Sequence, residues 1–267
     1  MDRDLTVDGI VLRTRRMGDM HRRLSLLCPD LGIIDVIAYG ARKGKRAMNA
    51  QMFSRSTFFL YHNPVRKEYT LKDARMESPH DGVRSRLDSM WAASFWSELC
   101  TRTAGGDWNA LFLLLSECLD ALEEDPSSVE RASIQFVWHL LHLAGIAPDL
   151  TRCPVSERVY THDEILGFSA SLLSPCSREN GDVDDMLLPP GARRYLAMTA
   201  GRAVREAVAV QLNDITALRI RRYMVRYAHL FAGGHLMTVE SGFGMMDMDD
   251  ESGNVSNEGS GDGSDDE

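Results

Sequence analysis

The densest group of cations in the sequence is a run of four lysines and arginines within five residues: Arg42, Lys43, Lys45 and Arg46. Gly44 loosens the run, so these side chains can meet successive phosphates, and each neutralised phosphate releases condensed counterions. The run therefore predicts contact with a polyanion, and the alternative is a loop that is simply solvated.

Two further sets of cations and one exposed aromatic complete the predicted DNA-binding surface. The first two predicted strands and their connection carry Arg13, Arg15, Arg16, Arg22 and Arg23. Aromatic rings that stack on unpaired bases contribute roughly 1–3 kcal/mol each. Candidate rings are Tyr39, Phe58, Phe59, Tyr61 and Tyr69; about half of them must instead fill the barrel core, and we include Tyr39 among the DNA-binding residues. Near the end of the chain, one face of a predicted helix carries Arg219, Arg222 and Arg226. DNA contact and a solvated or partner-facing stripe suit these arginines equally well.

Patterns that carry catalysis are absent from the sequence. It has no Gly-Lys-Ser/Thr phosphate loop, no His-Glu-x-x-His and no Gly-x-Ser-x-Gly. His139 and His142 lie three residues apart among apolar neighbours, which favours hydrogen-bonded core or interface histidines over a metal site. The polar cluster from His162 to Glu164 suits a solvated loop. We therefore expect no enzyme, no catalytic residue and no cofactor.

Charge divides the chain into three regions that the net charge of -9 conceals. Residues 1–78 carry a net +6, residues 79–239 carry -5, and residues 240–267 carry -10. Only the first region is suited to hold a polyanion.

Neither a membrane protein nor a secreted protein is expected. The apolar run at residues 111–115 is far shorter than the roughly 18 to 20 residues of a bilayer span, and the N-terminus is charged. The five cysteines are an odd number without dense spacing, which favours a reducing cytoplasm.

The first 79 residues have the pattern of a small β-barrel. Alternating polarity and turn residues predict five strands, at residues 5–13, 21–28, 32–39, 57–62 and 68–75. Five strands of this length favour an OB-fold, with an SH3-like barrel as the alternative.

Residues 80–239 have the pattern of an all-helical domain, which makes the fold class α+β. Helices are predicted from residue 87, at 109–123, at 127–144 in the centre of the bundle, at 190–211 and at 214–231. Residues 149–188 form an irregular insertion, and residues 240–267 are predicted to be a disordered acidic tail.

Several ordered motifs resemble one known family. Gly9-Ile10-Val11-Leu12-Arg13, the Leu24–Leu27 run and Gly40-Ala41-Arg42 are similar to the N-terminal domain of the bacterial DNA repair protein RecO family. The helix that ends at Gly145 and leads to Cys153, and the final Arg221-Arg222-Tyr223, are similar to its helical domain.

The resemblance implies a recombination mediator of the nucleoid. Such a protein binds single- and double-stranded DNA, anneals complementary strands, and helps to load recombinase together with RecR and the C-terminal tip of the single-strand DNA-binding protein. An OB-fold protein adaptor without direct DNA binding is the alternative, and a hydrolase around His162, Asp163 and Glu164 is a third class.

Two features depart from this family. Many RecO proteins hold zinc with two Cys-x-x-Cys pairs, whereas here Ser156 follows Cys153 and Glu179 follows Cys176 at that spacing, so we expect no structural zinc. The acidic tail is the second feature. It is expected either to compete for the DNA surface or to act only as a solubilising tail.

Overall fold

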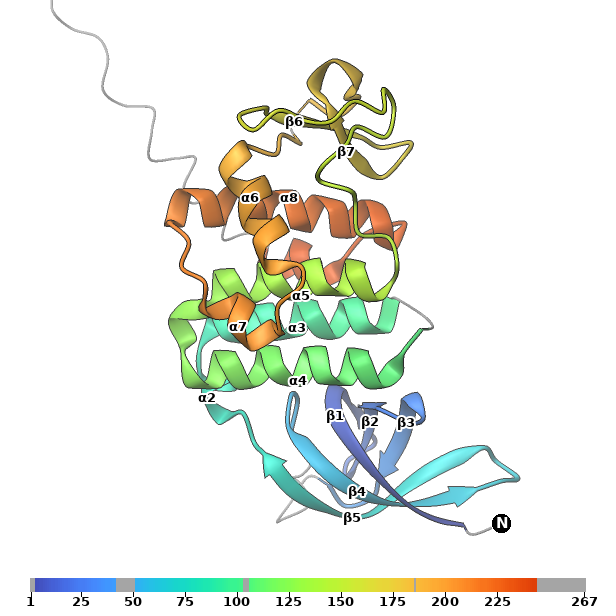
Figure 1. Ribbon diagram of the computed structural model, residues 1–267. Coiled ribbons are helices and arrows are strands. Elements are labelled where there is room, and N and C mark those ends of the chain that lie inside the picture. The colour runs from blue at the N-terminus through green and yellow to red at the C-terminus, as the bar shows by residue number, and fades with distance from the viewer. Residues whose placement is uncertain (1–2, 42–50, 103–105, 185, 244–267) are drawn as a thin grey trace, which may run out of the picture.

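The N-terminal part of the computed structural model is a closed barrel of five strands (Figure 1). The structure describes residues 3–41, 51–102, 106–184 and 186–243. The strands are β1 (Asp4–Met17), β2 (His21–Cys28), β3 (Gly32–Ala38), β4 (Arg55–Asn63) and β5 (Glu68–Ser78). Their order around the barrel is β1-β2-β3-β5-β4, with β3 parallel to β5 and the other pairs antiparallel. This closed order confirms the predicted five-stranded OB-fold barrel.

Strand β1 serves two hydrophobic cores because its side chains alternate between the faces of the sheet. Val11 belongs to the barrel interior, whereas Ile10 and Leu12 belong to the core of the helical region. The register with β2 shifts between Val11 and Arg13, so a bulge lies at this point of the strand. The outer face of strand β1 therefore packs directly against the helical region.

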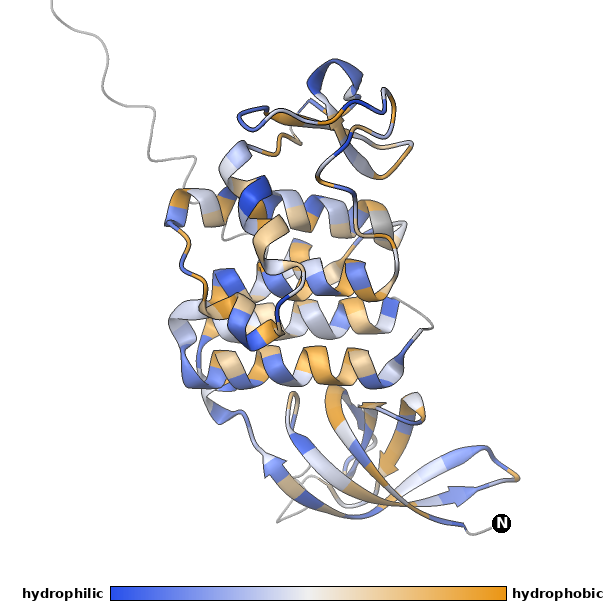
Figure 2. Ribbon diagram, in the orientation of Figure 1, coloured by the Kyte–Doolittle hydropathy of each residue, from blue (hydrophilic) through white to orange (hydrophobic). Residues whose placement is uncertain are grey.

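Seven helices follow the barrel in the described part of the chain. They are α2 (Asp81–Ser85), α3 (Leu87–Arg102), α4 (Trp108–Glu124), α5 (Val129–Leu143), α6 (Pro190–Thr199), α7 (Val204–Ala209) and α8 (Asp214–Ala232). Helix α5 packs against α3, α4, α7 and α8, as expected for the central helix. Figure 2 shows long apolar stretches on α4, the helix nearest the barrel. None of these helices combines the length and apolar character that a bilayer crossing requires.

The barrel and α4 approach each other closely at one glycine. Gly32 has a φ of +69°, and a Cβ at this position would lie 2.8 Å from the Trp108 ring. Only glycine accommodates both the left-handed backbone and the close contact. The turn between β2 and β3 therefore packs directly on the start of α4.

The prediction of one continuous helix at residues 190–211 is wrong, because the structure has two separate helices there. Helix α6 ends at Thr199, and Ala203 has the extended ψ of 145° that precedes α7. The Arg202 carbonyl accepts a hydrogen bond from the ring of His139 on α5 instead of a helical N–H. Gly201 lowers the helix propensity at the break.

The insertion contains a short hairpin that periodicity does not predict. Strands β6 (Leu166–Ser169) and β7 (Ser174–Ser177) lie at the end of the molecule opposite the barrel (Figure 1). Phe168 of β6 is fully buried, and its ring packs edge-on against Tyr223 and Tyr227 of α8 at 5.8 and 5.3 Å. Aromatic packing on α8 thus fixes the insertion to the bundle.

Helix α8 ends at Ala232, one residue past its predicted end, with Gly233 as its C-cap, and the chain then runs back along α3. Gly233 adopts a φ of +65°, and Leu236 is fully buried. Residues Val239–Phe243 form one further helical turn beside α3. Residues 240–243 of the predicted tail belong to this turn, and residues 244–267 lie outside the described part of the chain.

Candidate nucleic-acid interface

The outer face of the β1–β2 hairpin carries three exposed arginines. Arg13 pairs with Ser25 and Arg15 pairs with Arg23, so these side chains share one face of the hairpin. This face is continuous with the helical domain, because Leu12 belongs to the helical core. The structure thus brings together Arg13, Arg15 and Arg23 of the predicted set.

The other two arginines of the hairpin lie on its opposite face. Arg16 pairs with Arg22, and the neighbouring Leu24 belongs to the barrel interior. Arg16 is exposed and Arg22 is half-buried. The five predicted arginines therefore surround the end of the hairpin instead of forming one flat patch.

Like charges face each other twice across this hairpin. Arg15 is opposite Arg23, and Arg16 is opposite Arg22, an arrangement that destabilises an antiparallel pair. Arg23 lies 3.9 Å from Asp35, and both side chains are about half exposed, so this ion pair offsets little of the repulsion. A hairpin that places cations opposite one another is suited to an anionic ligand that relieves the repulsion.

A cleft of about 510 Å³ separates the outer face of the hairpin from α3. Arg13 and Arg15 line it from the barrel, and Arg102 lines it from the end of α3. Five hydroxyl groups line its wall, from Ser25, Ser94, Ser97, Thr101 and Thr238, and among the described residues all but that of Ser97 already donate a hydrogen bond within the protein. Its composition suits an anionic ligand.

The single carboxylate of this cleft is already occupied by hydrogen bonds. Glu98 accepts bonds from the backbone N–H groups of Met237 and Thr238 at 3.1 and 2.9 Å, and from the Thr238 hydroxyl at 2.8 Å. Burial raises the pKa of Glu98, but these bonds and nearby Arg102 outweigh it, so the net pKa is below the usual value. Glu98 therefore fixes residues 237–238 against α3.

The densest basic run lies outside the described residues, but its flanks are attached to the hairpin. Strand β3 ends at Ala38, opposite Arg22, and the Gly40 N–H donates to the His21 ring at 3.2 Å. After the run, the Phe53 N–H donates to the Val11 carbonyl at 2.7 Å. Between these two attachments lie Arg42, Lys43, Lys45 and Arg46.

The candidate stacking aromatics divide between surface and core. Tyr39 is 44% exposed and contacts His21 edge-on, with 4.9 Å between ring centroids. Phe58 is fully buried in the barrel, and Tyr69 stacks on His62 at 4.7 Å. Tyr39 is thus exposed beside the flank of the basic run, and Phe59 is also 39% exposed.

The arginines of α8 do not join this surface. Arg219 and Arg226 are exposed and Arg222 is half-buried. Helix α8 lies on the side of α5 away from the barrel (Figure 1), and its principal contacts are with α3, α5 and α6. The α8 set is therefore a separate candidate surface.

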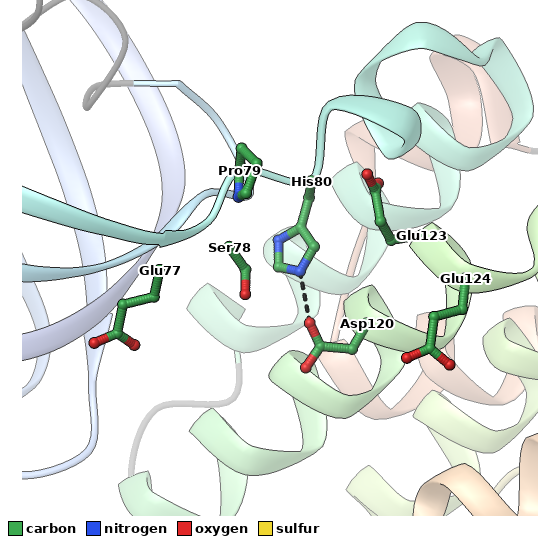
Figure 3. Close-up of a pocket in the computed structure, with 7 residues that line it drawn as sticks. All are labelled: Glu77, Ser78, Pro79, His80, Asp120, Glu123 and Glu124. Carbon is green, nitrogen blue, oxygen red and sulfur yellow. Dashed lines mark hydrogen bonds and ion pairs between the residues drawn. The ribbon is translucent and has the colours of Figure 1, made fainter.

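The junction between the barrel and the helices holds a second, acidic pocket of about 200 Å³ (Figure 3). Arg55 of β4 donates to Asp120 of α4 at 2.9 Å, and the ring of buried His80 contacts Asp120 at 2.8 Å and the Phe53 carbonyl at 2.7 Å. Burial raises the pKa of Asp120, but the bonds from His80 and Arg55 outweigh it and lower the net pKa. The pocket is also lined by Glu77, Glu123 and Glu124, so it is unsuited to DNA.

The histidine-containing candidates form structural contacts. His139 bonds to the carbonyls of Gln135 and Arg202, as expected for an interface histidine. His162 and Asp163 contact each other at 2.9 Å and are 74% and 88% exposed. Glu164 pairs with Arg158, which lowers the pKa of Glu164 to about 2 and keeps it ionised. His162 and Asp163 are thus solvent-exposed side chains, as expected for a solvated loop.

Two family models together cover most of the chain. Residues 1–80 match the model described as Recombination protein O N terminal, and residues 84–237 match Recombination protein O C terminal. The chain belongs to the recombination protein O (RecO) family. The resemblance inferred from the sequence motifs is thus confirmed.

Relatives within the RecO family are named as DNA repair proteins. DNA repair protein RecO of Rubrobacter xylanophilus is 33% identical over 226 residues, covering 82% of this chain and 90% of the relative. The Exiguobacterium protein of the same name is 26% identical over 87% of this chain and 92% of the relative. The match to the Nostoc sp. protein, at 28% identity, covers 61% of this chain and 57% of the relative. Membership of this family assigns the chain to DNA repair and recombination.

The insertion does not fit the zinc site that is common among RecO proteins. In the described residues, no three His, Cys, Asp or Glu side chains are grouped as metal ligands. Cys153 is buried, and its sulfur accepts bonds from the Ser177 N–H at 3.3 Å and the Asn180 amide at 3.7 Å. Burial raises the pKa of Cys153, but bonds from Ser156 and Ser177 outweigh it and lower the pKa to about 6. Protein donors thus bond to the sulfur that a metal would bind in other RecO proteins.

An arginine cross-links the insertion near Cys153. The Arg158 guanidinium donates to both carboxylate oxygens of Glu164, at 3.0 and 2.6 Å, and to the Ser177 hydroxyl at 2.8 Å. It also lies 3.9 Å from Glu179, which stands where many RecO proteins have a zinc ligand. A guanidinium that connects several chain segments can take over the cross-linking role of a metal ion.

Proposed function

We propose that this RecO-family protein acts as a non-enzymatic recombination mediator that binds single- and double-stranded DNA through its barrel. The observation that carries the proposal is the pairing of arginine with arginine across the β1–β2 hairpin, at Arg15–Arg23 and Arg16–Arg22. Such pairs weaken a sheet unless negative charge offsets the repulsion, and the phosphates of DNA can supply that charge.

The basic run extends the same proposed surface. The residues that flank the run, Gly40 and Phe53, both bond to the hairpin, so the chain enters and leaves the run at the hairpin that carries the arginine pairs. Tyr39 adds an exposed ring for an unpaired base. Contacts of this kind are made to phosphates and to the flat faces of bases, so the proposed binding does not depend on the nucleotide sequence of the DNA.

Strand annealing follows from the same chemistry. Two complementary strands repel each other, and neutralising their phosphates on one basic surface lowers that repulsion while the bases stay accessible. The family further supports partnership with RecR and with the C-terminal tip of the single-strand DNA-binding protein in loading recombinase, in the bacterial cytoplasm at the nucleoid.

A salt titration of binding tests this proposal. Replacing Arg42, Lys43, Lys45 and Arg46 together by Ala should weaken binding of a labelled single strand of any sequence. It should also flatten the slope of log K against log salt by about 0.7 for each phosphate that the variant no longer neutralises. Fluorescence anisotropy at several salt concentrations measures both quantities.

A second variant compares the two candidate surfaces. Replacing Arg219, Arg222 and Arg226 by Ala should leave affinity and slope unchanged if the barrel alone binds DNA. The opposite result, with the α8 variant impaired and the barrel variant unaffected, would move the DNA surface to α8. Absence of any DNA binding by the unaltered protein would favour the protein adaptor.

A further inference from the structure

We propose that the cleft between the β1–β2 hairpin and α3 is a docking site for the protein's own acidic segment, residues 244–267. Three observations carry this inference: the unsatisfied groups of the cleft, the position from which the segment departs, and its charge.

The cleft offers donors that the described residues do not use. Arg13 and Arg15 line it and form no ion pair with any carboxylate in the described part of the chain. The Ser97 hydroxyl also lines it, from a residue that is only 5% exposed, and it has no hydrogen-bond partner among the described residues. A buried unpaired hydroxyl is unfavourable, so it indicates a ligand with acceptor atoms.

The chain leads directly from this cleft into residues 244–267. Glu98 and Arg102 bind the backbone of residues 235–238, since Arg102 donates to the His235 carbonyl at 3.0 Å. Buried Leu236 fixes the same stretch to the helical core. Thr238 lines the cleft, and the five residues from there to Phe243 span at most about 18 Å. The segment therefore begins close to its proposed site.

The charge of the segment matches the cleft. Residues 244–267 contain nine Asp and Glu and no Lys or Arg. The cleft presents three arginines against one carboxylate, Glu98, which pairs with Arg102 at 3.6 Å, so the positive charges of Arg13 and Arg15 remain for the segment. Asp and Glu side chains can accept bonds from both the guanidinium groups and the Ser97 hydroxyl.

Docking would make DNA binding depend on salt and on displacement of the segment. A covalently attached ligand has an effective concentration of about 1 mM, so a segment with a dissociation constant of about 0.1 mM would weaken DNA binding about tenfold. This consequence for DNA rests on the proposed function, whereas docking of the segment does not.

The experiment uses full-length protein in which the nine carboxylates of residues 244–267 are changed to amides (Asp→Asn and Glu→Gln). A fluorescent peptide with the natural sequence of residues 244–267 is then titrated into this variant at low salt, and anisotropy reports binding. We expect saturable binding that weakens as salt rises, and no binding of an all-amide peptide. Adding Arg13→Ala and Arg15→Ala should abolish binding, whereas the charge-matched changes Arg66→Ala and Lys67→Ala should not.

Two results would overturn the inference: no binding of the natural peptide, or equal binding to both double variants. A parallel titration with single-stranded DNA keeps the two proposals apart. The amide variant should bind DNA about tenfold more tightly than the natural protein at low salt, and this gain should shrink as salt increases. Peptide binding without any DNA binding would refute the proposed function alone, and DNA binding without peptide binding would refute the docking site alone.

Discussion

Arg15 and Arg23 face each other in the β1–β2 hairpin, so the fold carries a repulsion between like charges at this pair. Replacing Arg15 by Thr, a good strand former, should leave the free energy of unfolding unchanged or raise it by up to about 0.5 kcal/mol. The same change should flatten the salt dependence of single-strand binding by about 0.7 in slope. Denaturant titration and anisotropy measure the two effects separately.

Arg55 provides the matched comparison from the neighbouring wall of the barrel. Because it pairs with Asp120, Arg55→Thr should lower the free energy of unfolding by about 1–3 kcal/mol and leave the salt slope of DNA binding unchanged. A loss of stability in Arg15→Thr as large as that in Arg55→Thr would mean that Arg15 is a structural residue.

Asp120 should make stability depend on pH. Its folded-state pKa is lowered, so its stabilising effect is present above the unfolded pKa of about 4 and is lost as pH falls through the folded pKa. Asp120→Asn should therefore destabilise the protein by about 1–2 kcal/mol at pH 7 and by progressively less below pH 4. Denaturant curves of both proteins between pH 3 and pH 7 test this, and a constant difference across that range would contradict it.

At the scale of elements, hydrophobic periodicity predicts the strands and helices that bury one face and expose the other. The alternation of β2 and β3 and the Asn213 and Gly233 caps of α8 are local signals, and the structure contains these elements where they were predicted. The break between α6 and α7 depends on the His139 ring of another helix, and β6 depends on Tyr223 and Tyr227. Contacts of this kind are decided by packing between distant segments, which no local pattern records.

The insertion is the element for which metal dependence can be tested directly. We expect protein purified without chelator to contain no stoichiometric zinc, and its melting temperature to be unaffected by EDTA. Arg158→Ala should instead lower the melting temperature by several degrees, because it leaves Glu164 and Ser177 without their common partner.

Arg158→Lys is the informative control, since lysine keeps the charge but loses the bidentate geometry. It should recover only part of the stability. One zinc per chain by elemental analysis, or a large effect of EDTA on melting, would contradict the expectation for the insertion.

At the scale of the molecule, the sequence predicts the types of residue at the interface but not the cleft that they form. Arg13 and Arg15 stand out as cations, yet their position opposite Arg102 requires β1, α3 and residues 237–238 to meet. Those segments are far apart in the chain, and the bulge between Val11 and Arg13 contributes to which face each arginine occupies. The role of Glu98 in holding residues 237–238 has no signal in the sequence.

The alternation of β1 between two cores also bears on how this protein can change over evolutionary time. Ile10, Leu12 and Leu27 are barrel residues by sequence but belong to the core of the helices, and Gly32 lies against Trp108. A barrel taken from a distant relative would bring an outer wall shaped for a different bundle, and the chimaera would have cavities or clashes at this seam. The two halves of the chain should therefore be inherited together, with substitutions on one side of the seam accompanied by compensating substitutions on the other.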